Sequence, residues 1–222
     1  GQIVLIDKPL GWTSFQVVNK VRWLIRKQFD LKKIKVGHAG TLDPLASGLL
    51  ILCTGKFTKK IDSFQAQIKE YTGSITLGAT TPSYDLETEI DQSFPLSGIT
   101  SESIRAVTHQ FTGEIQQQPP IFSALKKDGK RLYEYARSGE TVDIPSRTVT
   151  ISEFEISQIN LPEVAFRIVC SKGTYIRSLA HDFGKALNNG GHLSALRRTK
   201  IGDFNVASAV SIENFEKSLK ES

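Results

Sequence analysis

Apolar and polar positions follow two periodic patterns along this chain, and the first is helical. From Phe15 to Phe29 the apolar residues recur at helical intervals, and lysines and arginines occupy the opposite side. Thr13 and Gln16 stand three positions apart at the start of this run, which is the spacing of a capping box. The pattern predicts an amphipathic helix that ends near Gln28. Its basic side is also what an ordinary solvated face contains.

The second rhythm alternates, or stays apolar over short runs, which is typical of strands. Such runs occupy residues 3–6, 49–53, 69–78, 149–159, 164–170 and 193–206. Further helices are predicted at 101–111, at 175–187 and after Ser211, and the polar, turn-rich residues 79–99 suggest a surface excursion. Strands outnumber helices without a regular βαβ alternation. We therefore expect an α+β fold with a mixed or antiparallel central sheet flanked by helices.

A loop rich in glycine, at residues 37–48, precedes the apolar run 49–53. Its glycines free the backbone, and Pro44 stiffens the chain directly after Asp43. The loop thereby presents one carboxylate on a stiff turn beside a buried strand. Aspartate in such a turn commonly bonds its own backbone, so a turn role stands beside a catalytic one.

Residues 116–143 are predicted as a strand, a basic turn and a short helix. Within them, residues 122–137 interleave lysines and arginines with tyrosines. That mixture suits a phosphate backbone flanked by bases that can stack. The alternative is a surface hairpin followed by a helix that turns Leu132, Tyr135 and Ala136 toward the core.

The composition is that of an ordinary globular protein, and its charge favours an acidic partner. The chain has 222 residues, of which 39% are hydrophobic and 23% charged, and it carries a net charge of +5 with a pI of about 9.1. Nucleic acid is the first candidate partner of such a chain. A mildly basic enzyme whose charge serves solubility is the alternative.

The sequence excludes several common kinds of site. Cys53 and Cys170 lie in apolar runs as core residues of a reducing compartment, and no signal peptide or run of about 18 apolar residues is present, so a cytoplasmic protein is predicted. The motifs HExxH, GxSxG and GxGxxG are absent, as is a zinc-ligand set. What remains is a carboxylate without a metal, an arginine able to hold it, and aromatic residues able to hold a flat substrate.

Six segments together resemble one family, the TruB-type tRNA pseudouridine synthases, which make pseudouridine 55 in the T-loop. They are DKPLGWTSF at 7–15, GHAGTLDPLASGLL at 37–50, KEYTGSITLG at 69–78, PPIFSALKKDGKRLYEYAR at 119–137, CSKGTYIRSLAHDFG at 170–184 and HLSALRRTKIGDF at 192–204. They follow family order and span residues 3 to about 206. Ala39 stands where many members have threonine, a small change.

The resemblance implies an architecture as well as an activity. It implies a single pseudouridine synthase catalytic domain over residues 1–222, with a thumb-like, RNA-contacting insertion at about 116–146. A short helix at about 211–220 ends the chain, without the full C-terminal PUA-type domain that many relatives carry. No cofactor and no metal are expected.

The resemblance also assigns roles to single residues. Asp43 matches the family's nucleophile, and Arg177 matches the arginine that keeps this carboxylate charged and oriented. Tyr71 matches the tyrosine that stacks on the target base. Pocket and RNA contacts are implied for His38, Tyr175, Leu196, Lys126, Lys130 and Arg131. From the residues alone, Tyr71 is a half-buried strand residue and Arg177 an ordinary helix arginine.

The implied partner is tRNA, bound through its T stem-loop, with no membrane and no obligatory protein partner, and the protein is expected to be a monomer. A base in a folded T-loop must be flipped out to be reached, at a cost of a few kcal/mol in stacking and pairing. Two alternatives stay open. One is a guide-dependent or other-RNA pseudouridine synthase, and the other is an RNA-binding protein that helps tRNA to fold, with catalysis secondary.

Overall fold

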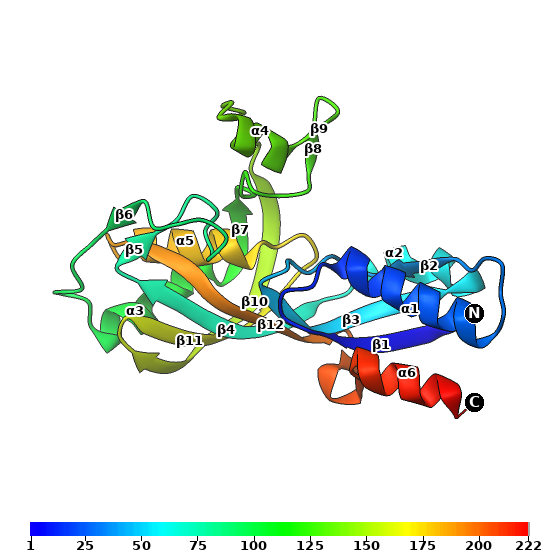
Figure 1. The fold of residues 1–222 in the computed structure, drawn as a ribbon. Helices are drawn as coiled ribbons and strands as arrows, with labels where there is room; N and C mark the ends of the chain where they lie inside the picture. Colours follow the sequence, from blue (N-terminus) through cyan, green and yellow to red (C-terminus); the bar gives the residue numbers. More distant parts are fainter. Residues whose placement is uncertain (222) are drawn as a thin grey trace. The chain divides into compact units, whose positions relative to one another are not determined.

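The computed structural model describes residues 1–221, which form two compact units (Figure 1). Unit 1 comprises residues 1–72 and the chain from Ala195 onward, and unit 2 comprises residues 73–194. Two strands are divided between the units, β4 (Lys69–Leu77) and β12 (Gly191–Ile201).

Unit 1 is built on the apolar strand that follows the glycine-rich loop. That strand is β3 (Ala46–Thr54). Besides β3 and its parts of β4 and β12, the unit contains β1 (Ile3–Lys8), α1 (Ser14–Gln28), β2 (Val36–His38), the 3₁₀ helix η1 (Gly55–Lys60), α2 (Ile61–Gln65), β13 (Phe204–Asn205), the 3₁₀ helix η3 (Val206–Ser208) and α6 (Ile212–Lys220). Strand β3 pairs antiparallel with β1 and β2, and parallel with β12.

Both faces of β3 are buried, as its continuous apolar run predicts. Leu50 and Leu52 face a core shared with α1 and α6, whereas Leu49, Ile51 and Cys53 belong to a second core. The alternation follows from the two-residue period of a strand. The predicted capping box is confirmed, because Thr13 and Gln16 exchange side-chain and backbone hydrogen bonds at the start of α1.

Unit 2 carries long antiparallel strands and the insertion. Its elements are β5 (Ala79–Thr80), β6 (Gln92–Ser93), α3 (Ser101–Val107), the 3₁₀ helix η2 (Thr108–Phe111), β7 (Gly113–Gln117), β8 (Lys126–Lys127), β9 (Lys130–Arg131), α4 (Leu132–Ser138), β10 (Arg147–Asn160), β11 (Glu163–Cys170) and α5 (Ile176–Ala186). Three aromatic rings, those of Phe154, Phe166 and Phe183, pack together from β10, β11 and α5.

The main sheet is mixed, with the hydrogen-bonded order β1-β3-β12-β4-β11-β10-β7. The β3–β12 pair is parallel, and the pairs of β1 with β3, β10 with β11, and β10 with β7 are antiparallel. This confirms the predicted α+β fold with a mixed sheet and helices. None of the helices in residues 1–221 is long and apolar enough to cross a membrane.

Several predicted boundaries were wrong. The loop at 37–48 is shorter than predicted, because its first residues pair as β2 and its last three begin β3. The helix at 101–111 tightens to a 3₁₀ helix after Val107, and the strand at 193–206 breaks into β12 and β13 at a turn through Gly202. The excursion at 79–99 is not wholly superficial, since Thr81, Ser83 and Asp85 are buried.

Candidate functional site

The candidate catalytic loop of unit 1, residues 39–45, joins β2 to β3, and hydrogen bonds from neighbouring segments hold its backbone. The hydroxyl of Ser14, the first residue of α1, accepts a hydrogen bond from the Leu42 amide (2.8 Å) and donates one to the Leu42 carbonyl (3.1 Å). The Ala46 amide donates to the Asp43 carbonyl, and the Gly11 amide donates to Pro44. Asp43 thus lies on a short turn held at both ends, and its side chain is half-buried.

Arg198 on β12 fixes the two flanks of this loop. Its guanidinium is almost fully buried and donates from Nε to the Leu49 carbonyl (2.8 Å) and from Nη2 to the Gly40 carbonyl (3.1 Å). The β12 backbone also runs against Gly48, whose φ is +103°. A Cβ at Gly48 would lie 2.3 Å from the Arg198 carbonyl oxygen, so glycine is required there by both conformation and space.

A second buried cation sets the electrostatics around Asp43. Lys8 is 0% exposed, and its ammonium donates to the carbonyls of Trp12 (2.6 Å) and Pro9 (3.0 Å). The pKa of Lys8 is lowered to about 8: burial is the main cause, the Asp43 carboxylate opposes it, and the Arg198 guanidinium adds a smaller lowering. Asp43 therefore lies close to buried positive charge.

Three other predicted residues lie in unit 1. Leu196 pairs in register with Ala46, three residues after Asp43. His38 ends β2; burial and, less strongly, Arg198 lower its pKa, with a backbone hydrogen bond at Gly40 opposing, so its ring is neutral near pH 7. Tyr71 lies on β4 and is 8% exposed, a more complete burial than the half-buried strand residue expected from sequence.

Arg197 was not singled out by the sequence analysis, although its place is specific. Its guanidinium binds the Asp7 carboxylate through two hydrogen bonds of 3.0 and 2.7 Å. Asp7 lies on β1 and Arg197 on β12, so this paired contact joins both strands next to β3. Such pairing between residues 190 positions apart carries no local sequence signal.

Arg177 lies in the first turn of α5 in unit 2 and is 4% exposed. Its Nη1 donates to the carbonyls of Phe122 (2.9 Å) and Ser83 (3.3 Å), and its Nε lies 3.6 Å from the Asp85 carboxylate. The buried guanidinium is therefore not the ordinary helix arginine of the alternative interpretation. Its predicted pairing with Asp43 stays a prediction.

Asp85 is another residue of the site region that sequence reasoning missed. It follows Tyr84, which adopts a left-handed φ of 63°, and it is 5% exposed. The hydroxyls of Thr81 and Ser83 donate to the Asp85 carbonyl, and the Glu87 amide donates to its carboxylate. The dense run of hydroxyl and carboxyl residues in this segment is the available signal, but such a run is equally typical of the surface excursion that the sequence analysis expects.

Tyr175, the residue before α5, is held on two sides. Gln117 is 1% exposed and pairs with the Tyr175 backbone, donating to its carbonyl (3.1 Å) and accepting from its amide (2.8 Å). The guanidinium of Arg147 lies over the tyrosine ring, 4.9 Å from its centroid, and donates to the Gly173 carbonyl. These contacts fix a half-buried aromatic ring that can serve one wall of a pocket.

The insertion at 116–146 contains a basic hairpin and a short helix, as predicted. Lys126 pairs with Arg131 in the β8–β9 hairpin, and both side chains are exposed. Lys130 is different, because its ammonium bonds Glu140 (2.7 Å) and lies over the Tyr135 ring (4.4 Å). Lys126 and Arg131 can therefore bind a phosphate without first breaking an ion pair, whereas Lys130 cannot.

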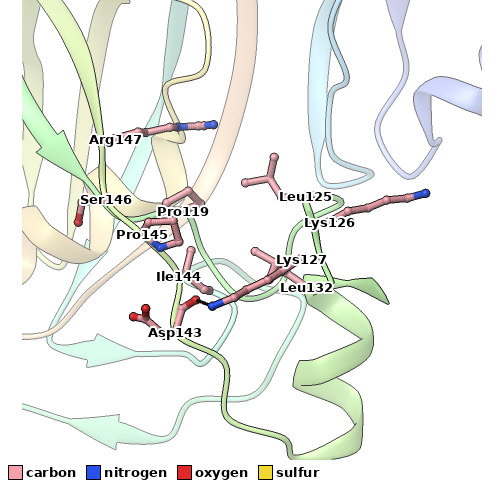
Figure 2. Close-up of a pocket in the computed structure, with 10 residues that line it drawn as sticks. All are labelled: Pro119, Leu125, Lys126, Lys127, Leu132, Asp143, Ile144, Pro145, Ser146 and Arg147. Atoms are coloured by element: carbon pink, nitrogen blue, oxygen red, sulfur yellow. Dashed lines mark hydrogen bonds between the residues drawn. The ribbon is translucent and has the colours of Figure 1, made fainter. Parts of the chain in front are cut away.

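A pocket of about 420 Å³ opens where the insertion meets the start of β10 (Figure 2). Apolar side chains line it together with polar and charged ones: Pro119, Leu125, Lys126, Lys127, Leu132, Asp143, Ile144, Pro145, Ser146 and Arg147. Leu132 is buried, which also satisfies part of the alternative in which α4 packs inward. A group of three or more metal-ligating side chains is not found within residues 1–221.

The predicted residues thus fall into two sets. Unit 1 brings His38, Asp43 and Leu196 to one loop and its flanking strands, with Tyr71 on β4. Unit 2 holds Tyr175 and Arg177 together with the three cations of the insertion.

Two family models together match residues 26–222 of the chain. One, described as TruB family pseudouridylate synthase (N terminal domain), matches residues 26–176. The other, described as tRNA pseudouridylate synthase B C-terminal domain, matches residues 177–222.

Curated proteins named tRNA pseudouridine synthase B are similar over nearly their full length. The one from Flavobacterium johnsoniae is 65% identical over 221 residues, which cover 99% of this chain and 96% of that protein. The one from Phocaeicola vulgatus is 53% identical, covering 100% of this chain and 94% of that protein.

Solved structures share the fold. A chain in "Crystal Structure of a Cbf5-Nop10-Gar1 Complex" is 31% identical, with a TM-score of 0.72 over 97% of this chain and 53% of that one. A chain in "Structure of H/ACA RNP bound to a substrate RNA containing 2'-deoxyuridine" is 29% identical, with a TM-score of 0.69 over 97% of this chain and 52% of that one. This chain spans about half the length of those two.

Proposed function

Because the chain belongs to the TruB family of pseudouridylate synthases, we propose that this isomerase converts uridine 55 in the T-loop of tRNA to pseudouridine, with Asp43 as its nucleophile. The similarity to proteins named tRNA pseudouridine synthase B, which extends over nearly the full length of both chains, supports tRNA as the substrate. A cytoplasmic, monomeric enzyme that acts without a protein partner belongs to the same proposal.

The reaction breaks the N1–C1′ bond of uridine and forms a C5–C1′ bond, with no change of oxidation state. A group is needed that can attach to the nucleoside and leave again, and an ionised carboxylate can do both. The observation that carries this role is the setting of Asp43: a half-exposed carboxylate on a turn fastened by Ser14 and Arg198, with the buried ammonium of Lys8 acting on it. Attack at C1′, attack at C6 and formation of a glycal all start from this charged form.

Arg177 is proposed as the cation that, in addition to Lys8, holds the Asp43 carboxylate during the reaction. Its guanidinium is desolvated and already oriented by two backbone carbonyls and Asp85, so the arginine itself needs no reorganisation to bind a carboxylate. A guanidinium can hold a carboxylate through two hydrogen bonds, which fixes direction as well as charge. Tyr71, Tyr175 and Leu196 provide the stacking face and walls for the uracil, and His38 handles the neighbouring displaced base.

The exposed cations of the insertion fit the need to hold the RNA while a base is flipped. Flipping costs a few kcal/mol, and phosphate contacts from Lys126 and Arg131 offset part of that cost. Lys130 contributes indirectly, by fixing Glu140 and Tyr135 behind the hairpin.

The proposal is tested by incubating the protein with an unmodified tRNA transcript and mapping any pseudouridine formed. Asp43→Asn keeps the size of the side chain and removes its charge. We expect turnover to fall by at least about 10⁴-fold, the loss seen when a nucleophile is removed, with the affinity for tRNA unchanged. Asp203→Asn, at the exposed turn after β12, is the matched control.

Two outcomes would favour the alternatives. Failure to modify a T-arm hairpin in the absence of guide RNA would point to a guide-dependent enzyme. Restoration of tRNA maturation by the Asp43→Asn variant would point to an RNA-folding role.

A further inference from the structure

The positive charge of the chain is concentrated in unit 1. This unit carries 17 lysines and arginines against 9 aspartates and glutamates, a net of +8, whereas unit 2 carries 11 against 14, a net of −3. Between residues 8 and 42 there are eight lysines and arginines and a single acidic residue, Asp30. The insertion, which lies in unit 2, therefore does not account for the basic character of the protein.

Five of these cations lie in the last turn of α1 or in the segment that follows it, here called the basic end: Arg26, Lys27, Lys32, Lys33 and Lys35. All five side chains are exposed. The segment is tied to its surroundings, because Arg26 donates from Nε to the Leu31 carbonyl (3.2 Å) and the Gly55 amide donates to the Lys35 carbonyl (2.8 Å). Figure 1 shows the chain turning back at this end of α1 toward β2.

Intramolecular contacts do not explain the charge of the basic end. The dipole of α1 favours cations in its last turn, which covers Arg26 and Lys27 but not the lysines beyond the helix. No carboxylate within residues 1–221 forms an ion pair with any of the five. Next to them Trp23 is 50% exposed, with the Lys20 and Lys27 ammonium groups 4.8 and 5.0 Å from its ring centroid.

We propose that the basic end binds the phosphate backbone of tRNA outside the T-arm, an inference that rests on the proposed function. Unpaired cations beside an exposed indole are the combination that binds a nucleic-acid backbone and stacks a base. The partner is RNA rather than an acidic protein because the same unit holds the candidate catalytic loop of an RNA-modifying enzyme.

The length of α1 sets which part of the RNA is reached. Ser14 at its first residue is bonded to Leu42, next to Asp43. The 15 residues of α1 then extend about 22 Å to the basic end. A stem of five pairs spans at most about 17 Å, taking the B-form rise of about 3.4 Å per pair as an upper value. Phosphates that reach Arg26 and Lys27, at the far end of α1, therefore lie near or beyond the end of such a stem, where the full transcript offers backbone that the hairpin lacks.

The test compares two RNAs, the full tRNA transcript and a T-loop hairpin with a five-pair stem. For Lys32→Glu/Lys33→Glu we expect KM for the transcript to rise about tenfold, because two phosphate contacts become repulsive. The value of kcat for the transcript and the kcat/KM for the hairpin should not change. Lys217→Glu/Lys220→Glu, on exposed α6 positions of the same unit, is the matched control and should leave both RNAs unaffected.

Three results would overturn the inference: an equal loss on hairpin and transcript, no loss on either, or the same loss in the α6 control. Capture of the protein by anionic lipid vesicles, with an unchanged KM for the transcript, would assign the surface to a membrane instead. Lys32→Gln/Lys33→Gln repeats the test with less perturbation should the reversed variant unfold. A failure of the proposed function is distinguishable, since the unaltered protein would then form no pseudouridine in either RNA.

Discussion

At the scale of single residues, the charge state of Lys8 is the most informative feature of the candidate site. Its ammonium is fully buried and interacts electrostatically with Asp43. Arg198 is buried beside the same loop, so two cations and one carboxylate share a small volume. A change in the protonation of Lys8 within the working pH range should therefore change the electrostatic field in which Asp43 acts.

We predict an alkaline decline of kcat/KM with a midpoint near pH 8, because the pKa of Lys8 is lowered to about 8. Above that pH the ammonium loses its proton and the cation beside Asp43 disappears. The profile of kcat/KM reports groups of the free enzyme, so it is the quantity to measure. Lys8→Met should lower the plateau at pH 7 and abolish the decline.

The free energy of unfolding should rise with pH over the range in which kcat/KM falls. The folded pKa lies below the unfolded value of 10.5, so the unfolded chain binds more protons between about pH 8 and 10.5, and the free energy of unfolding rises with pH there. Denaturant titrations at pH 7.5 and pH 9.5 separate the two effects. An activity loss accompanied by unfolding, or a decline unchanged in Lys8→Met, would contradict the assignment.

At the scale of elements, the candidate loop depends on the close approach of β3 and β12. Gly48 pairs with Arg198 in the parallel register, and no room exists between them for a Cβ. The loop geometry is therefore a property of two strands and not of the loop residues alone.

Gly48→Ala should destabilise the protein by about 2–4 kcal/mol, because it combines backbone strain with a clash against backbone atoms that cannot rotate away. Gly98→Ala is the control, since Gly98 also has a positive φ (91°) but open space around it. We expect that control to cost about 1 kcal/mol. Equal losses in urea denaturation would show that the clash is relieved by movement of β12.

Elements whose signals are local could be predicted from the sequence. The capping box at Thr13, the two buried faces of the run 49–53 and the N-cap at Ser211 all come from residues a few positions apart. Asp43 was singled out by the turn on which it stands together with the family motif around it, and its catalytic role stays a prediction. The partners of Asp85 and Arg198 could not, since Arg177 and Gly40 lie 92 and 158 positions away and only the folded chain brings them together.

At the scale of the whole molecule, charge is distributed unevenly, with a net of +8 in unit 1 and −3 in unit 2. Sequence-wide charge indicated a nucleic-acid partner without indicating which surface it meets. The location of that surface depends on which cations are left without carboxylate partners, and this is a tertiary property. Lys130 illustrates the point, because it belongs to the predicted basic hairpin and yet forms an ion pair with Glu140.

Affinity for the tRNA transcript should fall steeply with salt. The logarithm of the binding constant should decrease linearly with the logarithm of salt concentration, by about 0.7–0.9 for each phosphate contact. A filter-binding or anisotropy titration measures this slope, and Lys32→Glu/Lys33→Glu should make it shallower by about 2. A flat response in the unaltered protein would remove the phosphate-contact role of both the insertion and the basic end.

The candidate loop is anchored from behind by Ser14 and Arg198, but three of its forward residues, Thr41, Pro44 and Leu45, face solvent. Laboratory evolution toward other nucleosides would therefore find tolerated substitutions at these three positions. Gly48 and Arg198 hold the backbone on which these three residues stand, so such a library should leave both unchanged.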